Sequence, residues 1–149
     1  MPDSSSPAEA ADRLNRRRAR ILPVLAAFML IQQATFFGAS GGVRSVDMVR
    51  NSAWIVLAAV IVATLVTGGY WLQSREVRRL IDDEVTQANR SSALAWGFTV
   101  AMIAAIGLFA LESFGPGQAT TREAIHIIVT AGLATALLRF GYVERRALG

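Results

Sequence analysis

The sequence predicts an all-α membrane protein with four antiparallel transmembrane helices, and two observations carry this prediction. Apolar residues make up 53% of the chain and charged residues only 17%, and the charged residues gather between four apolar runs. Each run has close to the roughly 20 residues that a helix needs to cross about 30 Å of hydrocarbon. Helices are the expected form because their backbone groups hydrogen-bond within one segment, as lipid requires.

The first twenty residues form a separate segment. Residues 1–12 are small, polar and rich in Ser, and the basic block RLNRRRAR follows them. Such a composition is typical of disorder. We therefore expect residues 1–20 to be a disordered, basic, cytoplasmic N-terminus, and residues 21–149 to form the membrane domain. A cleavable signal peptide is the alternative, but Phe37 stands where a small residue is preferred before the cleavage point.

Four spans follow from the apolar runs. The second and third runs contain no charged residue, whereas the first carries Gln32 and Gln33, and the fourth carries His126 and Arg139. A polar side chain in a span is costly unless a neighbouring helix meets it, so at least one glutamine is expected to face the bundle. The predicted spans are 21–39, 53–72, 93–111 and 124–142.

The arginines predict the orientation of the chain. All 15 basic residues are Arg. Five precede the first span, four lie between the second and third spans, and three lie at the C-terminal end, so twelve share one side and three the other. The positive-inside rule places both termini on the cytoplasmic side of a bacterial inner membrane. The pI near 10.9 would also suit nucleic-acid binding, but topology accounts for the arginines, and direct nucleic-acid binding is not expected.

Catalytic and metal chemistry have few candidate residues. The chain has no Cys and a single His, which excludes disulfides and thiolate chemistry and disfavours transition-metal sites. Glu112, Glu123 and His126 fall near the same end of the third and fourth spans, with Glu123 and His126 three positions apart. Proton sensing or metal binding is one interpretation of this group, and plain interfacial placement is the other. We expect no enzyme activity, no metal and no cofactor.

Small residues recur at four-residue spacing in the third span and again in the fourth. Such stripes let helix backbones approach closely. Packing inside the four-helix bundle is one interpretation, and the face of a homodimer is the other. The candidate packing residues are Gly97, Ala101, Ala105, Gly132 and Ala136.

The connection between the second and third spans, residues 73–92, carries the candidate partner-binding surface. Its apolar residues recur at helical spacing, which predicts a helical extension of the second span and a turn near Asn89. The apolar stripe either lies against its own bundle or the lipid surface, or it docks a cytoplasmic partner. The residues assigned to partner binding are Val77, Leu80, Ile81, Asp82, Asp83, Glu84 and Val85.

The same connection resembles one found in a loose group of small, four-span bacterial inner-membrane proteins. The resemblance rests on the acidic DDE at 82–84, QANR at 87–90 and the Ala-rich entry ALAWG at 93–97. Some members look as though they are encoded beside helix-turn-helix regulators, which implies a membrane-bound regulator of transcription. No site residues are carried over from the group.

The expected function is therefore non-enzymatic. We expect a regulatory or scaffolding membrane protein that binds a cytoplasmic partner, such as a transcriptional regulator, through its inner loop. The alternative is a subunit of a small oligomeric transporter or channel. Membrane lipids, one cytoplasmic protein and a second copy of the chain are the expected partners.

Overall fold

A computed structural model describes residues 7–38, 44–68, 84–114 and 120–147, and these residues form helices and no strand. Each of the four helices is long and apolar enough to cross a membrane. The predicted all-α, four-span fold is thus confirmed, and the chain is a multi-pass membrane protein. The helices are α1 (Pro7–Gly38), α2 (Arg44–Thr67), α4 (Glu84–Phe114) and α5 (Thr121–Ala147).

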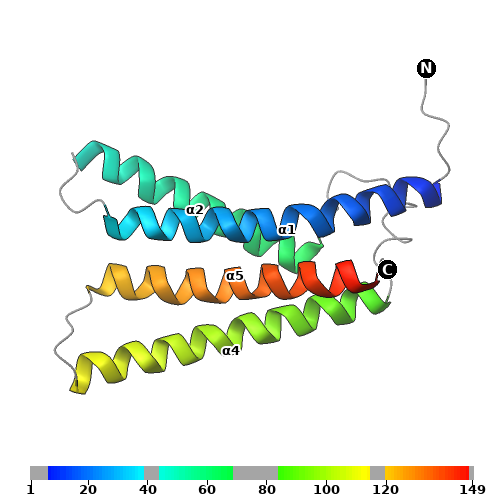
Figure 1. Cartoon of the computed structure of the whole chain (residues 1–149). Coiled ribbons are helices and arrows are strands. Elements are labelled where there is room, and N and C mark those ends of the chain that lie inside the picture. The colour runs from blue at the N-terminus through cyan, green and yellow to red at the C-terminus, as the bar shows by residue number, and fades with distance from the viewer. Residues whose placement is uncertain (1–6, 39–43, 69–83, 115–119, 148–149) are drawn as a thin grey trace.

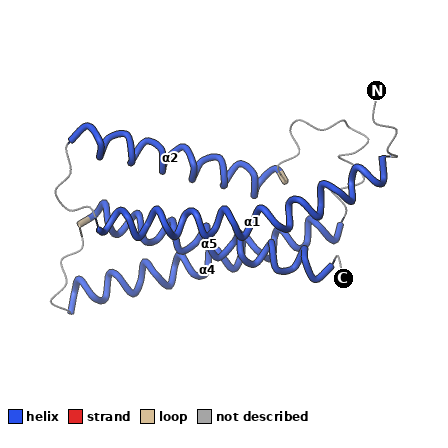
Figure 2. Tube along the Cα trace, turned by 45° about the horizontal axis from the view of Figure 1, so that its top comes forward, coloured by secondary structure: helices blue, strands red, loops and turns tan. Residues whose placement is uncertain are grey.

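The last helix, α5, is the centre of the bundle. It lies between α1 and α4 and packs extensively against both of them, whereas α2 packs less closely (Figure 1). Figure 2 shows α2 standing apart from the group that the other three helices form. Helices α1 and α4 begin, and α2 and α5 end, at one end of the bundle, which we name the arginine-rich end. The other end is named the far end.

The core follows from apolar residues at helical spacing. On α2, for example, Trp54, Ala58, Ile61 and Leu65 are buried at intervals of four, three and four residues, which places them on one face. That face meets buried residues of the other three helices. The resulting core cluster consists of Leu22, Ala26, Met29, Ile61, Leu65, Ala93, Ala136, Leu137 and Phe140.

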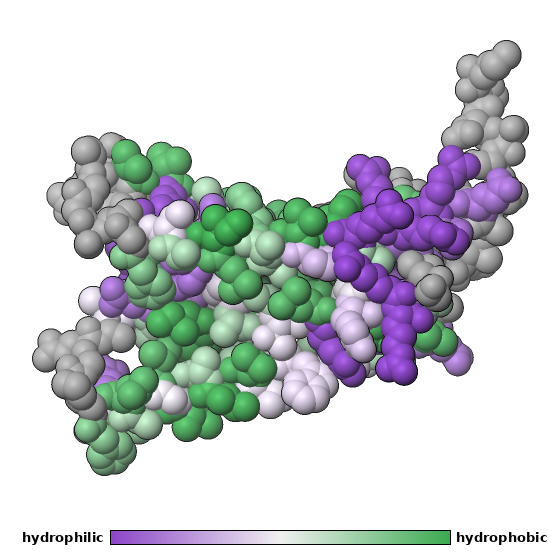
Figure 3. Space-filling model, viewed as in Figure 1, coloured by the Kyte–Doolittle hydropathy of each residue, from purple (hydrophilic) through white to green (hydrophobic). Residues whose placement is uncertain are grey.

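The outward faces are apolar too, as expected where lipid is the solvent. Large side chains such as Val60, Phe98, Ile106 and Phe109 are more than half exposed. In Figure 3 hydrophobic residues cover the middle of the visible face, and hydrophilic residues gather over the arginine-rich end. Some hydroxyls in the spans bond back to their own helix, as Thr99 Oγ1 does to the Ala95 carbonyl at 2.9 Å.

The N-terminal segment differs from the sequence-based expectation. Disorder was expected over residues 1–20, and this is wrong for residues 7–20, which are helical and continuous with the first span. Pro7 suits the first helical position, and the Ala, Arg and Leu residues that follow are strong helix formers. An exposed pair between Arg16 Nε and Asp12 Oδ2, 3.1 Å apart, joins successive turns.

The connections also differ in their boundaries. Helix α2 begins at Arg44, nine residues before the predicted second span, and ends beside Gly68, whose φ of 78° suits a helix C-terminus. The turn expected near Asn89 is wrong, because α4 begins at Glu84 and runs through Asn89 without a break. Helical residues 84–92 therefore belong to the third span, while residues 69–83 lie outside the described part of the chain.

Candidate functional site

A polar cluster joins α1 to α5 near the far end of the bundle. Its centre is the Gln33 side chain of α1, whose Oε1 lies 2.8 Å from His126 Nδ1 and 2.9 Å from Thr130 Oγ1. His126 and Thr130 are four residues apart on α5, so both side chains face α1. Because an amide oxygen only accepts hydrogen bonds, the arrangement requires the Nδ1 proton on His126. At least one glutamine was expected to face the bundle, and Gln33 confirms this.

The histidine ring of this cluster lies between two aromatic rings. Phe36 stacks on one side with ring centroids 4.1 Å apart, and Trp54 stacks on the other at 3.9 Å. Since Trp54 comes from α2, the imidazole connects three helices. His126 is only 6% exposed, so the ring is enclosed by its neighbours on three helices. We name Gln33, Phe36, Trp54, His126 and Thr130 the far-end cluster.

Two buried donors of the far-end cluster have no acceptor. Gln33 Nε2 and Trp54 Nε1 are shielded from solvent, and neither hydrogen-bonds within the described residues. An unpaired buried donor costs about 1–3 kcal/mol. Arg50, which lies over the Phe36 ring at 5.5 Å from its centroid, adds positive charge to this region. The cluster therefore presents donors and cationic charge, and the carboxylates predicted beside His126 do not join it.

The expected group of Glu112, Glu123 and His126 is not assembled. Glu123 Oε2 instead accepts hydrogen bonds from the Thr120 backbone N–H at 2.7 Å and from its hydroxyl at 2.9 Å. The Glu123 N–H donates back to Thr120 Oγ1, which completes a capping box at the start of α5. Glu112 is exposed near the end of α4. Among the described residues, no three His, Asp or Glu side chains are placed to hold a metal ion.

A charged contact joins α1 to α5 near the arginine-rich end. Arg18 pairs with Glu144, and both side chains are largely buried. The Arg18 guanidinium also lies over the Phe140 ring, 4.8 Å from its centroid. One residue further along each helix, Arg145 Nε donates to the Ala19 carbonyl oxygen at 3.0 Å. These contacts fix the basic half of α1 against the end of α5.

Close backbone approach holds α4 against α5. A Cβ atom on Gly97 would lie only 2.7 Å from the Gly132 carbonyl oxygen and 2.8 Å from the Ala136 Cβ. A Cβ on Gly132 would meet the Ala101 Cβ at 3.0 Å. Four of the five candidate packing residues thus meet inside one chain, while Ala105 is partly buried further along α4. The homodimer interpretation stays a prediction.

Most of the candidate partner-binding surface lies outside the described residues. This applies to Val77, Leu80, Ile81, Asp82 and Asp83. The two remaining members, Glu84 and Val85, form the start of α4, and both are exposed. Comparison with family models, with curated proteins and with solved structures gives no match for this chain.

Proposed function

We propose that this chain is a non-enzymatic protein of a bacterial inner membrane that binds a cytoplasmic partner at its arginine-rich end and thereby regulates or scaffolds it. One observation supports this most strongly. Helix α1 has 32 residues, which at 1.5 Å each is about 48 Å, well beyond a hydrocarbon core of about 30 Å. Figure 1 shows its N-terminal end reaching past the end of α5.

The protruding part of α1 is suited to a fixed surface rather than a loose tail. The Arg18–Glu144 pair and the Arg145–Ala19 bond hold its base. Beyond this point Arg13, Arg16 and Arg17 are exposed. Each can contribute about 1 kcal/mol of attraction to anionic headgroups, so the basic residues would hold the helix at the membrane surface.

The partner surface would then include the acidic start of α4. Glu84 and Val85 are exposed there, and Asp82 and Asp83 precede them in the sequence. An acidic cluster with apolar neighbours suits a basic protein such as a DNA-binding regulator, and binding would compete with DNA for the same positive surface. The alternative is a subunit of a small oligomeric transporter or channel. The core cluster inside one copy is apolar, so a polar path in such a protein would have to lie between copies.

The test is to capture a bound protein by photo-crosslinking from a position near either end of α4. A photo-crosslinking amino acid is placed at Val85 or at Phe114, which are 59% and 93% exposed near opposite ends of α4. We expect one soluble protein crosslinked to Val85 and not to Phe114, and its loss in the D82N/D83N/E84Q triple variant. The captured protein should bind the purified wild type directly. Equal capture at both positions, or capture unaffected by the triple variant, would contradict the proposal.

Orientation is tested separately. Reporters active only in the periplasm or only in the cytoplasm are fused after Gly117 and after Gly149. The arginine distribution predicts periplasmic activity at Gly117 and cytoplasmic activity at Gly149. Periplasmic activity at Gly149 would place the arginine-rich end outside the cell and remove the basis for a cytoplasmic partner.

A further inference from the structure

A lateral groove of about 750 Å³ lies between α1 and α2 in the half of the bundle nearer the far end. On α2 its lining runs from Met48 to Val60, which is about 18 Å of helix. This length is close to the roughly 15 Å depth of one hydrocarbon leaflet. Because both helices are long and apolar enough to span a membrane, we expect the apolar part of the groove to be open to lipid.

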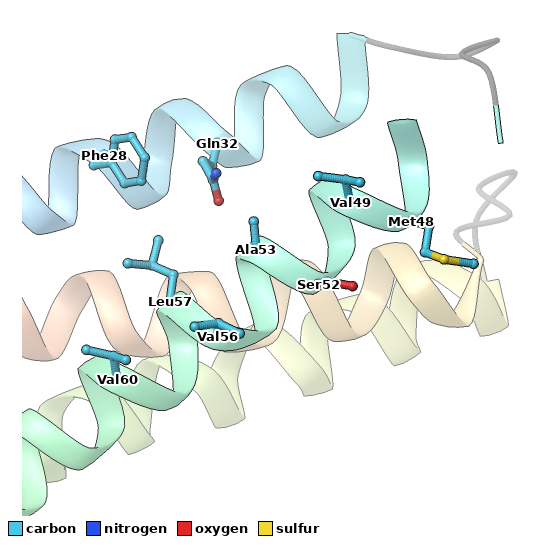
Figure 4. Close-up of a pocket in the computed structure, with 9 residues that line it drawn as sticks. All are labelled: Phe28, Gln32, Met48, Val49, Ser52, Ala53, Val56, Leu57 and Val60. Atoms are coloured by element: carbon cyan, nitrogen blue, oxygen red, sulfur yellow. The ribbon is translucent and has the colours of Figure 1, made fainter. Parts of the chain in front are cut away.

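Polarity changes along this groove. Its deep part is formed by apolar side chains, Phe28, Val56, Leu57 and Val60. The two polar lining residues, Gln32 and Ser52, lie nearer the far end, and Figure 4 shows the Gln32 amide directed from α1 towards α2. Neither side chain hydrogen-bonds to any described residue. An amide without a partner is costly at this depth, so the groove favours an occupant that supplies an acceptor there.

We propose that the groove holds one acyl chain of a membrane phospholipid, and that the Gln32 amide donates a hydrogen bond to the ester carbonyl of that chain. A phospholipid carries its carbonyl above its hydrocarbon, in the same order as the polar and apolar parts of the groove. The proposal goes beyond the proposed function and does not depend on it.

The shape of the groove favours lipid over a second copy of the chain. A twofold dimer brings the same surface of both copies together, and two concave surfaces leave a gap instead of interdigitating. Insertion of another face of a second copy would be a head-to-tail contact, which extends without closing. A lipid chain reaches the groove directly from the bilayer.

The experiment measures retained lipid by native mass spectrometry of the full chain. The protein is extracted from vesicles that contain equal amounts of ester-linked palmitoyl-oleoyl phosphatidylcholine and its ether-linked analogue, which lacks the carbonyl. We expect one tightly retained lipid per chain and about fivefold preference for the ester form, the effect of one net hydrogen bond. Gln32→Leu keeps the apolar groove and should abolish the preference.

A matched pair of substitutions on α2 tests the groove itself. Ala53→Phe fills the groove, whereas Ala59→Phe adds the same side chain at an exposed position of α2 outside it. Retention should fall at least fivefold in the first variant and stay unchanged in the second. If Ala53→Phe fails to fold, the ester preference of wild type and its loss in Gln32→Leu still decide the question.

Three outcomes would overturn the proposal. The first is equal retention by Ala53→Phe and wild type. The second is an ester-to-ether ratio near one in wild type, or a preference that survives Gln32→Leu. The third is a wild-type dimer that Ala53→Phe converts to a monomer, which would assign the groove to protein.

Discussion

The two faces of α5 are held by different forces. Towards α1 the contact has polar ends, the far-end cluster at one and the Arg18–Glu144 pair at the other, with apolar packing between them. Towards α4 the contact depends on Gly97 and Gly132. Because glycine has no side chain, the two helix backbones can approach closely there. In lipid the hydrophobic effect does not drive helices together, so hydrogen bonds and close packing have to do so. One helix in this chain uses both means, one on each face.

Breaking the ion pair tests the α1 face most severely. In Glu144→Leu the Arg18 charge stays buried without its partner, which should lower the free energy of unfolding by about 3–5 kcal/mol. The measurement is unfolding by SDS in mixed micelles, followed by far-UV circular dichroism. The double variant Arg18→Met/Glu144→Leu should recover most of the loss, because no charge remains buried. A double variant as unstable as the single one would show that the pair is net stabilising.

Filling the glycine contact tests the α4 face. Gly97→Leu would place its Cβ within 3 Å of backbone on α5, so the two helices must separate, at a cost of about 3 kcal/mol. Gly107→Leu is the control, since a Cβ there meets nothing within 4 Å. The same unfolding measurement applies to both. Equal stability of the two variants would show that the close approach contributes little.

Removing the Gln33 side-chain oxygen, which His126 and Thr130 share as an acceptor, tests the far-end cluster. Gln33→Leu leaves both His126 and Thr130 without their acceptor and should cost about 2 kcal/mol. The neighbouring Gln32→Leu is the control, because Gln32 lies outside the α1–α5 contact. If both glutamine variants unfold at the same SDS fraction, the cluster does not hold the helices together.

The smallest effect on stability is expected from removing the Thr130 hydroxyl. Thr130→Val keeps the shape and removes one of the two hydrogen bonds to Gln33 Oε1, and bonds of this kind in membrane proteins average about 0.6 kcal/mol. The loss should disappear when Gln33→Leu is already present, which a double-mutant cycle measures. Additive losses would mean that Thr130 acts through some other contact.

Hydropathy and charge predicted the helical class and the number of spans, because lipid constrains length and polarity within each segment. The small-residue stripe in the third span also pointed to residues that do meet α5. The helix limits were harder. Hydropathy reports the apolar part of a helix, whereas α1 begins at Pro7, fourteen positions before the predicted span, in a segment rich in Ala and Arg that favours helix without favouring lipid.

The polar contacts between distant residues could not be predicted. Gln33 and His126 are 93 positions apart, and Arg18 and Glu144 are 126 apart, so no local spacing joins either pair. Instead the sequence suggested Glu123 as the partner of His126, since the two are neighbours on one helix. A signal was available in the Thr120-x-x-Glu123 pattern, which is that of a capping box and predicts that the carboxylate is engaged at the helix start.

The spacing of the two polar contacts along α5 can also be compared with the thickness of a membrane. Eighteen residues separate His126 from Glu144, which is about 27 Å of helix. Polar groups are tolerated best near the edges of the hydrocarbon, so we expect the bundle to suit a hydrocarbon core of about this thickness. A thicker bilayer would have to thin around the protein, at a fraction of a kcal/mol for each Å of mismatch. We therefore expect the chain to prefer bilayers whose hydrocarbon core is near this thickness, whatever partner it binds.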